Sequence, residues 1–189
     1  MQLNVEHTGD WLASDFSFTR AKLSADARLS TFFRRRIQPT TLDLRVVGGG
    51  ALGTLPLQRY GVIEASPLPY TPFGALRTLD DRPYQGSEYA ALFWEHNFRT
   101  VPFELLGLYG IADRSIELIL HGGHGRTWID DGQDATLRRR GVGLRTADEV
   151  HHELGISVNG VLRDLLRIDF TARLDRPAYS IGVSLLRYF

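Results

Sequence analysis

The sequence predicts an all-β protein built from about eight antiparallel strands. Apolar and polar side chains alternate with a period of two along most of the chain, which is the side-chain period of a β-strand. The alternating runs reach about ten residues, whereas strands of soluble proteins average about 5–6. Short and long connections alternate between the central runs. We therefore expect strands at 2–8, 15–33, 38–50, 87–99, 113–122, 148–158, 164–174 and 178–189.

The bulk composition is that of one folded domain spanning residues 1–189. Hydrophobic residues make up 43% of the chain and charged residues 23%, and 22 basic residues balance 22 acidic ones. A net charge of zero gives no electrostatic case for a nucleic-acid partner. The chain has no cysteine. This excludes disulfides, thiolate metal sites and a cysteine nucleophile.

The first half of the chain supplies the strands at 15–33 and 38–50. Between Ala21 and Phe33, small and apolar residues hold the odd positions, and Lys22, Asp26 and Arg28 hold even ones. The next run places apolar and polar residues on opposite parities: Leu42, Leu44 and Val46 against Thr41, Asp43 and Arg45. Each run therefore predicts a strand with one apolar and one polar face.

The second half repeats this pattern four times. The apolar sets are Ala90, Leu92, Trp94 and Phe98; Val150, Leu154, Ile156 and Val158; Leu166, Ile168, Phe170, Ala172 and Leu174; and Tyr179, Ile181, Val183, Leu185 and Phe189. The polar sets between them include Glu95 and Asn97; Glu149, His151, Glu153 and Ser157; Arg167, Asp169, Thr171 and Arg173; and Ser180 and Ser184. The last strand ends on the aromatic Phe189.

The connections differ in length. The stretches "FFRRRIQP", "LYGIAD" and "NGVLRD" are interpreted as short turns, and residues 51–86 and 123–147 as long loops rich in glycine, proline and charge. Short turns at one end and long loops at the other are typical of transmembrane β-barrels. The short "LDRP" connection departs from this trend.

Two interpretations of the alternation remain open at this point. In a soluble antiparallel sandwich or small ligand-binding barrel, the apolar face points inward and the polar face meets water. In a transmembrane β-barrel, the apolar face meets lipid and the polar face lines the lumen. Long strands and alternating loop lengths favour the antiparallel transmembrane barrel. The terminal Phe189 adds a resemblance to the C-terminal strand of outer-membrane barrels.

Several stretches from about residue 38 onward resemble the bacterial surface antigen superfamily of outer-membrane assembly-factor barrels. The ending "LLRIDFTARLDRPAYSIGVSLLRYF" is similar to the last hairpin of that family. "FGALRTLDDRPYQGSEYAALFWEHNF" resembles its long loop with an "LRGY"-type motif, in which Arg77 matches the motif arginine. "IELILHGGHGRTW" is similar to its "fvDaGrvW" strand: Gly125 and Trp128 match, and Gly123 replaces the usual aspartate. "VHHELGISVNGVL" resembles members that carry an N-terminal carboxypeptidase-regulatory-like domain.

The resemblance implies a larger assembly. The eight strands would be the C-terminal half of a sixteen-stranded barrel. Because the N-terminal stretch "MQLNVEHTGD" lacks the features of a signal peptide, a C-terminal fragment or a truncated reading frame is the simplest expectation, and a self-closing eight-stranded barrel is the alternative. The loop at 51–86 would fold into the lumen through Arg77 and Gly125. Tyr179, Ile181, Val183, Leu185 and Phe189 would form the C-terminal signal read by the barrel-assembly machinery. The implied role is non-enzymatic, in protein assembly or translocation or at the surface of the bacterial outer membrane, with lipid as partner and the client unknown.

The residues themselves indicate no catalytic site, cofactor or metal. His121 and His124 have opposite parities, as do His151 and His152, so neither pair converges within a strand. The glycines at 48–50 lack a following Lys-Ser/Thr and helix, which excludes a P-loop and favours a strand end or bulge. The polar-face charges are expected to pair across strands in a lumen, or to be solvated in a soluble sheet: Asp43, Arg45, Glu153, Arg167, Asp169 and Arg173.

Overall fold

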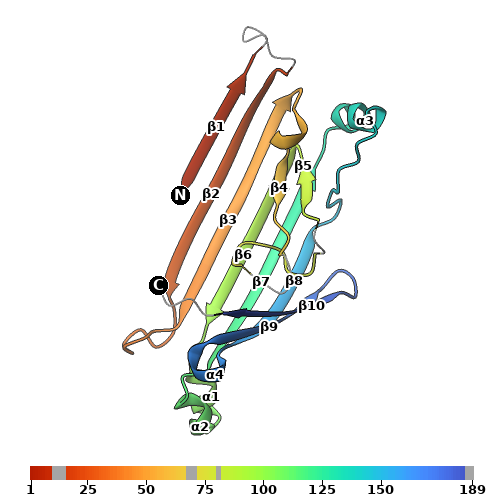
Figure 1. Cartoon of the computed structure of the whole chain (residues 1–189). Coiled ribbons are helices and arrows are strands. Elements are labelled where there is room, and N and C mark those ends of the chain that lie inside the picture. The colour runs from red at the N-terminus through yellow and green to blue at the C-terminus, as the bar shows by residue number, and fades with distance from the viewer. Residues whose placement is uncertain (10–15, 67–71, 80–81, 186–189) are drawn as a thin grey trace.

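A computed structural model of the chain contains one open antiparallel sheet (Figure 1). The structure describes residues 1–9, 16–66, 72–79 and 82–185. The sheet has eight strands in the order β1-β2-β3-β6-β7-β8-β9-β10, so neighbours in the chain are neighbours in space. Their bounds are β1 (Gln2–Thr8), β2 (Phe18–Ser30), β3 (Thr41–Gly53), β6 (Glu88–Asn97), β7 (Glu117–Trp128), β8 (His151–Gly160), β9 (Leu166–Arg173) and β10 (Tyr179–Leu185).

The number of strands in the main sheet is as predicted, but the strand expected at 113–122 was placed too early. β7 continues to Trp128, so residues 123–128 belong to the sheet and not to the loop expected at 123–147. Gly122, Gly123 and Gly125 carry no side chain and hide the alternation. β3 likewise runs to Gly53, which places the glycines at 48–50 inside a strand rather than at its end.

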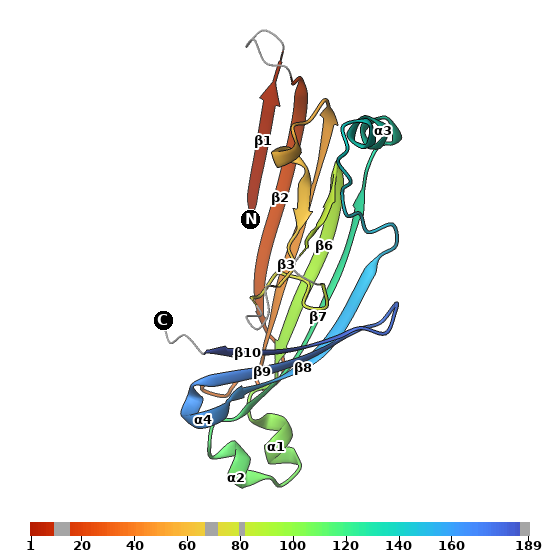
Figure 2. The ribbon, with the colours of Figure 1, turned by 45° about the vertical axis from the view of Figure 1, so that its right-hand side comes forward.

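The sheet is strongly twisted and curled. β9 and β10 run across the direction of β1 to β3, and they bend toward the side on which the long loop lies (Figures 1 and 2). The alternating faces follow the predicted parity. Glu153, Ser157, Asp169 and Thr171 on the concave face are at most 2% exposed. The opposite face exposes apolar side chains: Val46, Leu92, Leu120, Leu154, Ile156, Ile168, Phe170, Ile181 and Val183.

The long connection between β3 and β6 folds over the concave face. It carries the 3-10 helix η2 (Leu57–Arg59) and two short strands, β4 (Gly61–Ile63) and β5 (Tyr84–Gly86), which pair antiparallel with each other. Residues 54–87 are called the plug loop below. Its Ile63, Leu76 and Leu79 pack with Tyr89 and Phe93 of β6 in one buried apolar cluster. The core therefore lies between the sheet and its own loop.

A second apolar cluster lies under the β7–β8 connection. That connection contains helix α3 (Asp131–Arg139), whose Leu137 packs with Phe18, Leu55 and Tyr60. The Asp130 carboxylate caps the helix by accepting the backbone N–H groups of Gly132 and Gln133. The sequence interpretation found no helix here, because a helix of nine residues makes only about two and a half turns and gives little periodicity.

The other end of the sheet holds three turns. Helices α1 (Val101–Leu105) and α2 (Tyr109–Ala112) join β6 to β7, and α4 (Val161–Asp164) joins β8 to β9. The "LYGIAD" stretch is therefore part of a helical connection and not a short turn. Among the described residues, no helix is long and apolar enough to cross a membrane.

Candidate functional site

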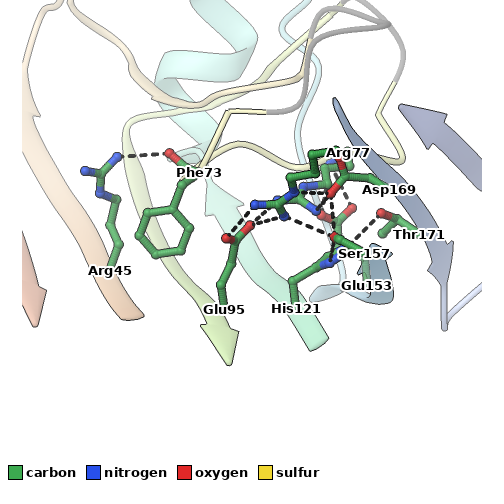
Figure 3. Close-up of polar contacts among 10 residues, drawn as sticks. Arg45, Phe73, Arg77, Glu95, His121, Glu153, Ser157, Asp169 and Thr171 are labelled. Atoms are coloured by element: carbon green, nitrogen blue, oxygen red, sulfur yellow. Dashed lines mark hydrogen bonds and ion pairs between the residues drawn. The ribbon is translucent and has the colours of Figure 1, made fainter. Parts of the chain in front are cut away.

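The plug loop presents Arg77 to the middle of the concave face. Two backbone hydrogen bonds join the segments around Ala65 and Leu76 as an isolated parallel bridge: the Ser66 N–H donates to the Leu76 carbonyl, and the Leu76 N–H donates to the Glu64 carbonyl, each at 2.9 Å. Leu76 is fully buried against the sheet. This anchoring directs the next side chain, Arg77, into a cluster of charges from β6, β8 and β9 (Figure 3).

Two arginines and two carboxylates form a closed ring of ion pairs. Arg77 donates from Nη1 to Asp169 Oδ1 at 3.0 Å and from Nη2 to Glu95 Oε1. Arg167 donates from Nη2 to Glu95 Oε1 at 2.7 Å and from Nε to Asp169 Oδ1 at 2.9 Å. Each arginine thus contacts both carboxylates. Charge-assisted hydrogen bonds of this kind are about twice as strong as neutral ones.

Burial makes this ring sensitive to the loss of any member. Arg77 is 4% exposed and Asp169 is 1% exposed. A charge removed from water needs a partner of opposite sign, and removing one partner of such a pair typically costs about 3–5 kcal/mol. Two positive and two negative charges satisfy one another here. The ring therefore ties the plug loop to β6 and β9 by groups that cannot easily separate.

A third carboxylate holds the backbone of the plug loop. Glu153 of β8 accepts the Arg77 N–H on both oxygens, at 2.9 and 3.0 Å, and its Oε2 also accepts the Thr78 N–H at 3.0 Å. The Thr78 hydroxyl donates to the same oxygen at 2.9 Å. His151 Nε2 lies 3.3 Å from Oε2. Glu153 thus acts as an anion bound in a small nest of loop donors.

A chain of neutral hydrogen bonds extends the site along β7, β8 and β9. The Ser157 hydroxyl donates to Asp169 Oδ1 at 2.5 Å and lies 2.9 Å from His121 Nδ1. Because a hydroxyl has one proton, His121 donates from Nδ1 to Ser157, and its Nε2 accepts from the Thr171 hydroxyl at 2.9 Å. The Ser157 proton is therefore directed at the Asp169 carboxylate, and the His121 imidazole donates to Ser157 instead of accepting from it.

Glycines in β7 and β8 provide the space for this packing. A Cβ on Gly123 would lie 3.0 Å from both Glu153 Oε1 and the Leu76 side chain. A Cβ on Gly155 would lie 2.2 Å from His121 Nε2 and 2.4 Å from the Phe170 carbonyl oxygen. Gly125, the other residue of the predicted loop–lumen motif, faces Ile63 of the plug loop, with 3.0 Å to its Cδ1 from an added Cβ. These positions favour glycine because neighbouring atoms approach closely.

The structure brings together most of the residues singled out from the sequence. Arg77 and Gly125 both lie at the interface between plug loop and sheet; Asp43, Arg45 and Arg167 pair with charges on other strands, whereas Arg173 pairs with Asp175 in the turn that follows β9. Asp43 binds Arg28, Arg45 binds Asp26, and Arg45 also donates to the Phe73 carbonyl of the plug loop at 3.1 Å (Figure 3). Position 123 is a glycine and supplies no carboxylate, and the carboxylates that bind Arg77 come from Glu95 of β6 and Asp169 of β9.

Sequence reasoning missed the role of Glu95 as a partner of Arg77. The parity of β6 placed Glu95 on the polar face, which was the available signal. To identify Glu95 as the partner of Arg77, the register of the paired strands must be known. Glu95 lies opposite His121, His121 lies opposite Gly155, and Ser157 lies opposite Asp169. These adjacent rows bring the four strands' polar groups into one cluster.

The C-terminal signal residues and the pair His124 and His152 lie away from this site, whereas His121 and His151 belong to it. Tyr179, Ile181, Val183 and Leu185 share the exposed face of β10, and Phe189 lies outside the described residues. His124 and His152 contact each other on the opposite face, 2.9 Å apart between their Nδ1 atoms, whereas His121 and His151 are buried. Within the described ranges, no three histidine or carboxylate groups converge as they would around a metal ion.

No protein-family model matches the chain, and no curated protein sequence is significantly similar to it.

Proposed function

We propose that this chain forms part of the wall of a transmembrane β-barrel of the bacterial outer membrane, with the plug loop folded into the lumen. The observation that carries the proposal is the polarity of the two faces. The concave face buries charged and polar side chains under the plug loop. The opposite face exposes apolar side chains, with Ile156 at 41% and Phe170 at 47% exposed.

A hydrocarbon environment accounts for this arrangement. Exposed apolar residues on consecutive strands are favourable against lipid chains and unfavourable against water. A soluble sandwich or ligand-binding barrel requires the reverse, with the apolar face covered. The long strands also support the proposal, because a tilted strand needs about 9–11 residues to cross a bilayer.

The open edges support a barrel larger than this sheet. Within the described chain, β1 and β10 each pair on one side only. An unpaired edge cannot face hydrocarbon, because its backbone N–H and C=O groups would lack partners. We propose that further strands complete the ring, as in a sixteen-stranded barrel of which these eight form the C-terminal half. Membrane lipid and the barrel-assembly machinery are then the partners, and Tyr179 to Phe189 the segment that this machinery reads.

The proposed activity is non-enzymatic. The charged groups of the buried site are used to hold the plug loop on the concave face, where Arg77 pairs with Glu95 and Asp169. A barrel whose lumen is occupied by a held loop suits the assembly or translocation of other proteins, or a role at the cell surface, as the resemblance to outer-membrane assembly factors implies. The client is not identified by any feature of the chain.

The test is the solvent that the chain needs in order to fold. We expect the chain, refolded from denaturant, to gain strand structure and resistance to protease in detergent micelles or lipid vesicles, and to aggregate in buffer alone. Ile156→Glu places a charge on the proposed lipid face and should reduce insertion into vesicles. The matched variant Arg28→Glu alters an exposed ion pair on the concave side and should insert normally. A monomeric, folded chain in detergent-free buffer would exclude the proposal.

A further inference from the structure

Three connections at one end of the sheet, residues 31–40, 98–116 and 161–165, form a surface that is called the turn end below. It lies opposite the plug loop and α3 (Figures 1 and 2). Polar residues normally occupy such turns. Here each connection exposes large apolar side chains: Phe32, Phe33 and Ile37; Leu105, Leu106, Leu108 and Tyr109; and Leu162 and Leu165. Ile37 is fully exposed and Leu105 is 76% exposed.

The backbone of the turn end is held in an unfavourable conformation. Four non-glycine residues of the described chain have a positive φ, and all four lie here: Phe33 at 55°, Arg99 at 58°, Ser115 at 56° and Leu162 at 52°. A left-handed conformation is costly for bulky side chains, at about 1–3 kcal/mol each. At Phe33 and Leu162 this strain accompanies an apolar side chain that packs against little of the protein. Strain of this kind is concentrated at functional surfaces.

The turn end also carries positive charge. Residues 31–40 contain Arg34, Arg35 and Arg36 and no acidic residue, and residues 98–116 contain two arginines and two acidic residues. Arg34 and Arg35 are exposed. Arg36 donates to both oxygens of Glu104, at 2.9 and 2.5 Å, which ties the β2–β3 turn to helix α1. Arg34 and Arg35 therefore supply the charge that remains for a partner.

We propose that the turn end is a membrane-contact surface that lies in the headgroup region of a bilayer leaflet and prefers anionic phospholipids. Apolar side chains interleaved with arginines are the chemistry of interfacial segments, in which the former enter the acyl boundary and the latter bind phosphates. The surface continues the apolar face of the sheet, through Leu29 at the end of β2 and Ile168 near the start of β9. This inference rests on the proposed function, which places the sheet in a membrane. It adds that the turn end contacts the headgroups of anionic phospholipids.

Single-cysteine labelling tests this directly, because the chain has no cysteine of its own. An environment-sensitive fluorophore is attached to the full chain, reconstituted in vesicles of phosphatidylcholine and phosphatidylglycerol, at one position at a time. Ile37→Cys and Leu106→Cys report on the turn end. Ile156→Cys reports on the apolar face, and Ala135→Cys in α3 reports on the opposite end. Lipids carrying a quencher near the headgroup or deep in the acyl chain then locate each label.

We expect the two turn-end labels to be quenched by the shallow quencher and the Ala135→Cys label to be unaffected. Quenching should be stronger when the quencher is carried by phosphatidylglycerol, by about fivefold for each arginine near the surface. The double variant Arg34→Gln/Arg35→Gln should remove this preference while leaving the deep quenching of the Ile156→Cys label unchanged.

The outcomes separate the inference from the proposed function. Turn-end labels that stay water-exposed while the Ile156→Cys label is quenched would overturn the lipid contact and leave the barrel standing. Turn-end quenching without quenching at Ile156→Cys would overturn the transmembrane sheet and leave surface binding. No quenching at either place would overturn both. Equal quenching by the two lipids would overturn the anionic preference.

Discussion

Replacing Arg77 by alanine should release the plug loop from the sheet. Arg77→Ala removes two charge-assisted hydrogen bonds, to Glu95 and Asp169. Each such bond contributes about 1.5–3 kcal/mol. Arg167 remains beside both carboxylates and limits the penalty of leaving them buried. We therefore expect the free energy of plug opening to fall by about 3 kcal/mol, near the lower limit for breaking a buried ion pair.

Hydrogen exchange of the plug amides measures this opening. The Arg77 and Thr78 N–H groups bond to Glu153, so they exchange only when the loop leaves the sheet. A loss of about 3 kcal/mol corresponds to exchange about 10²-fold faster at these amides. Arg77→Lys keeps the charge but loses the forked geometry, and should give an intermediate rate.

Arg28→Ala is the matched control. It also breaks an arginine–carboxylate pair on the concave side, with Asp43, but the Arg28 side chain is 75% exposed and forms no ion pair with the described residues of the plug loop. Exposed pairs contribute about 0–1 kcal/mol. Plug amides that exchange at the same rate in Arg77→Ala and Arg28→Ala would refute the reasoning that burial gives the ring its strength.

Three further predictions test other parts of the structure. Glu153→Gln keeps the size of the side chain but presents an amide N–H₂ to loop donors, so plug exchange should accelerate by at least tenfold although Arg77 is intact. Gly155→Ala should lower the free energy of unfolding by about 1–3 kcal/mol, because the added Cβ meets the carbonyl oxygen of Phe170. Gly110→Ala is the control and should be tolerated, because an added Cβ there has nothing within 4 Å. Equal urea midpoints for the two variants would contradict this prediction. Hydrogen bonds from Arg36 and Thr100 lower the pKa of Glu104 from 4.5 to about 2. The ion pair between Arg36 and Glu104, which joins the β2–β3 turn to α1, should therefore be complete above pH 4.5 and weaken as the pH falls toward 2. A distance between spin labels on the two turns that stays constant over this pH range would argue against it.

The sequence predicted the strands well because alternation is a local signal. Six of the eight strands of the main sheet fall on a run with one apolar and one polar parity, namely β2, β3, β6, β8, β9 and β10. The signal failed where glycine replaced side chains, which is why the end of β7 was assigned to a loop. It also failed for α3, although the Asp130 cap, two acidic residues in the first turn and two arginines in the last turn were present.

The candidate site was predicted only in part, because its geometry depends on register. Arg77 could be selected from the motif that it shares with the resembled family. Its partners could not, since Glu95 and Asp169 are separated in the chain and meet only when β6, β7, β8 and β9 align. The direction of the two faces was also left open by the sequence, because alternation is the same whether the apolar side is covered or exposed.

The way the plug loop is attached to the sheet determines when, during folding, the loop can dock. Its two ends join β3 and β6, which are adjacent in the sheet, so the loop can swing in or out without breaking a strand pairing. Its docking contacts, however, come from β6, β8 and β9, and the last of these is synthesised well after the loop. The loop cannot lock until β9 has paired in the correct register, because a shift by one residue would turn Asp169 to the other face. Docking of the plug loop therefore depends on correct pairing of the sheet. If β9 pairs in the wrong register, Arg77 lacks Asp169 and the loop is not held on the concave face.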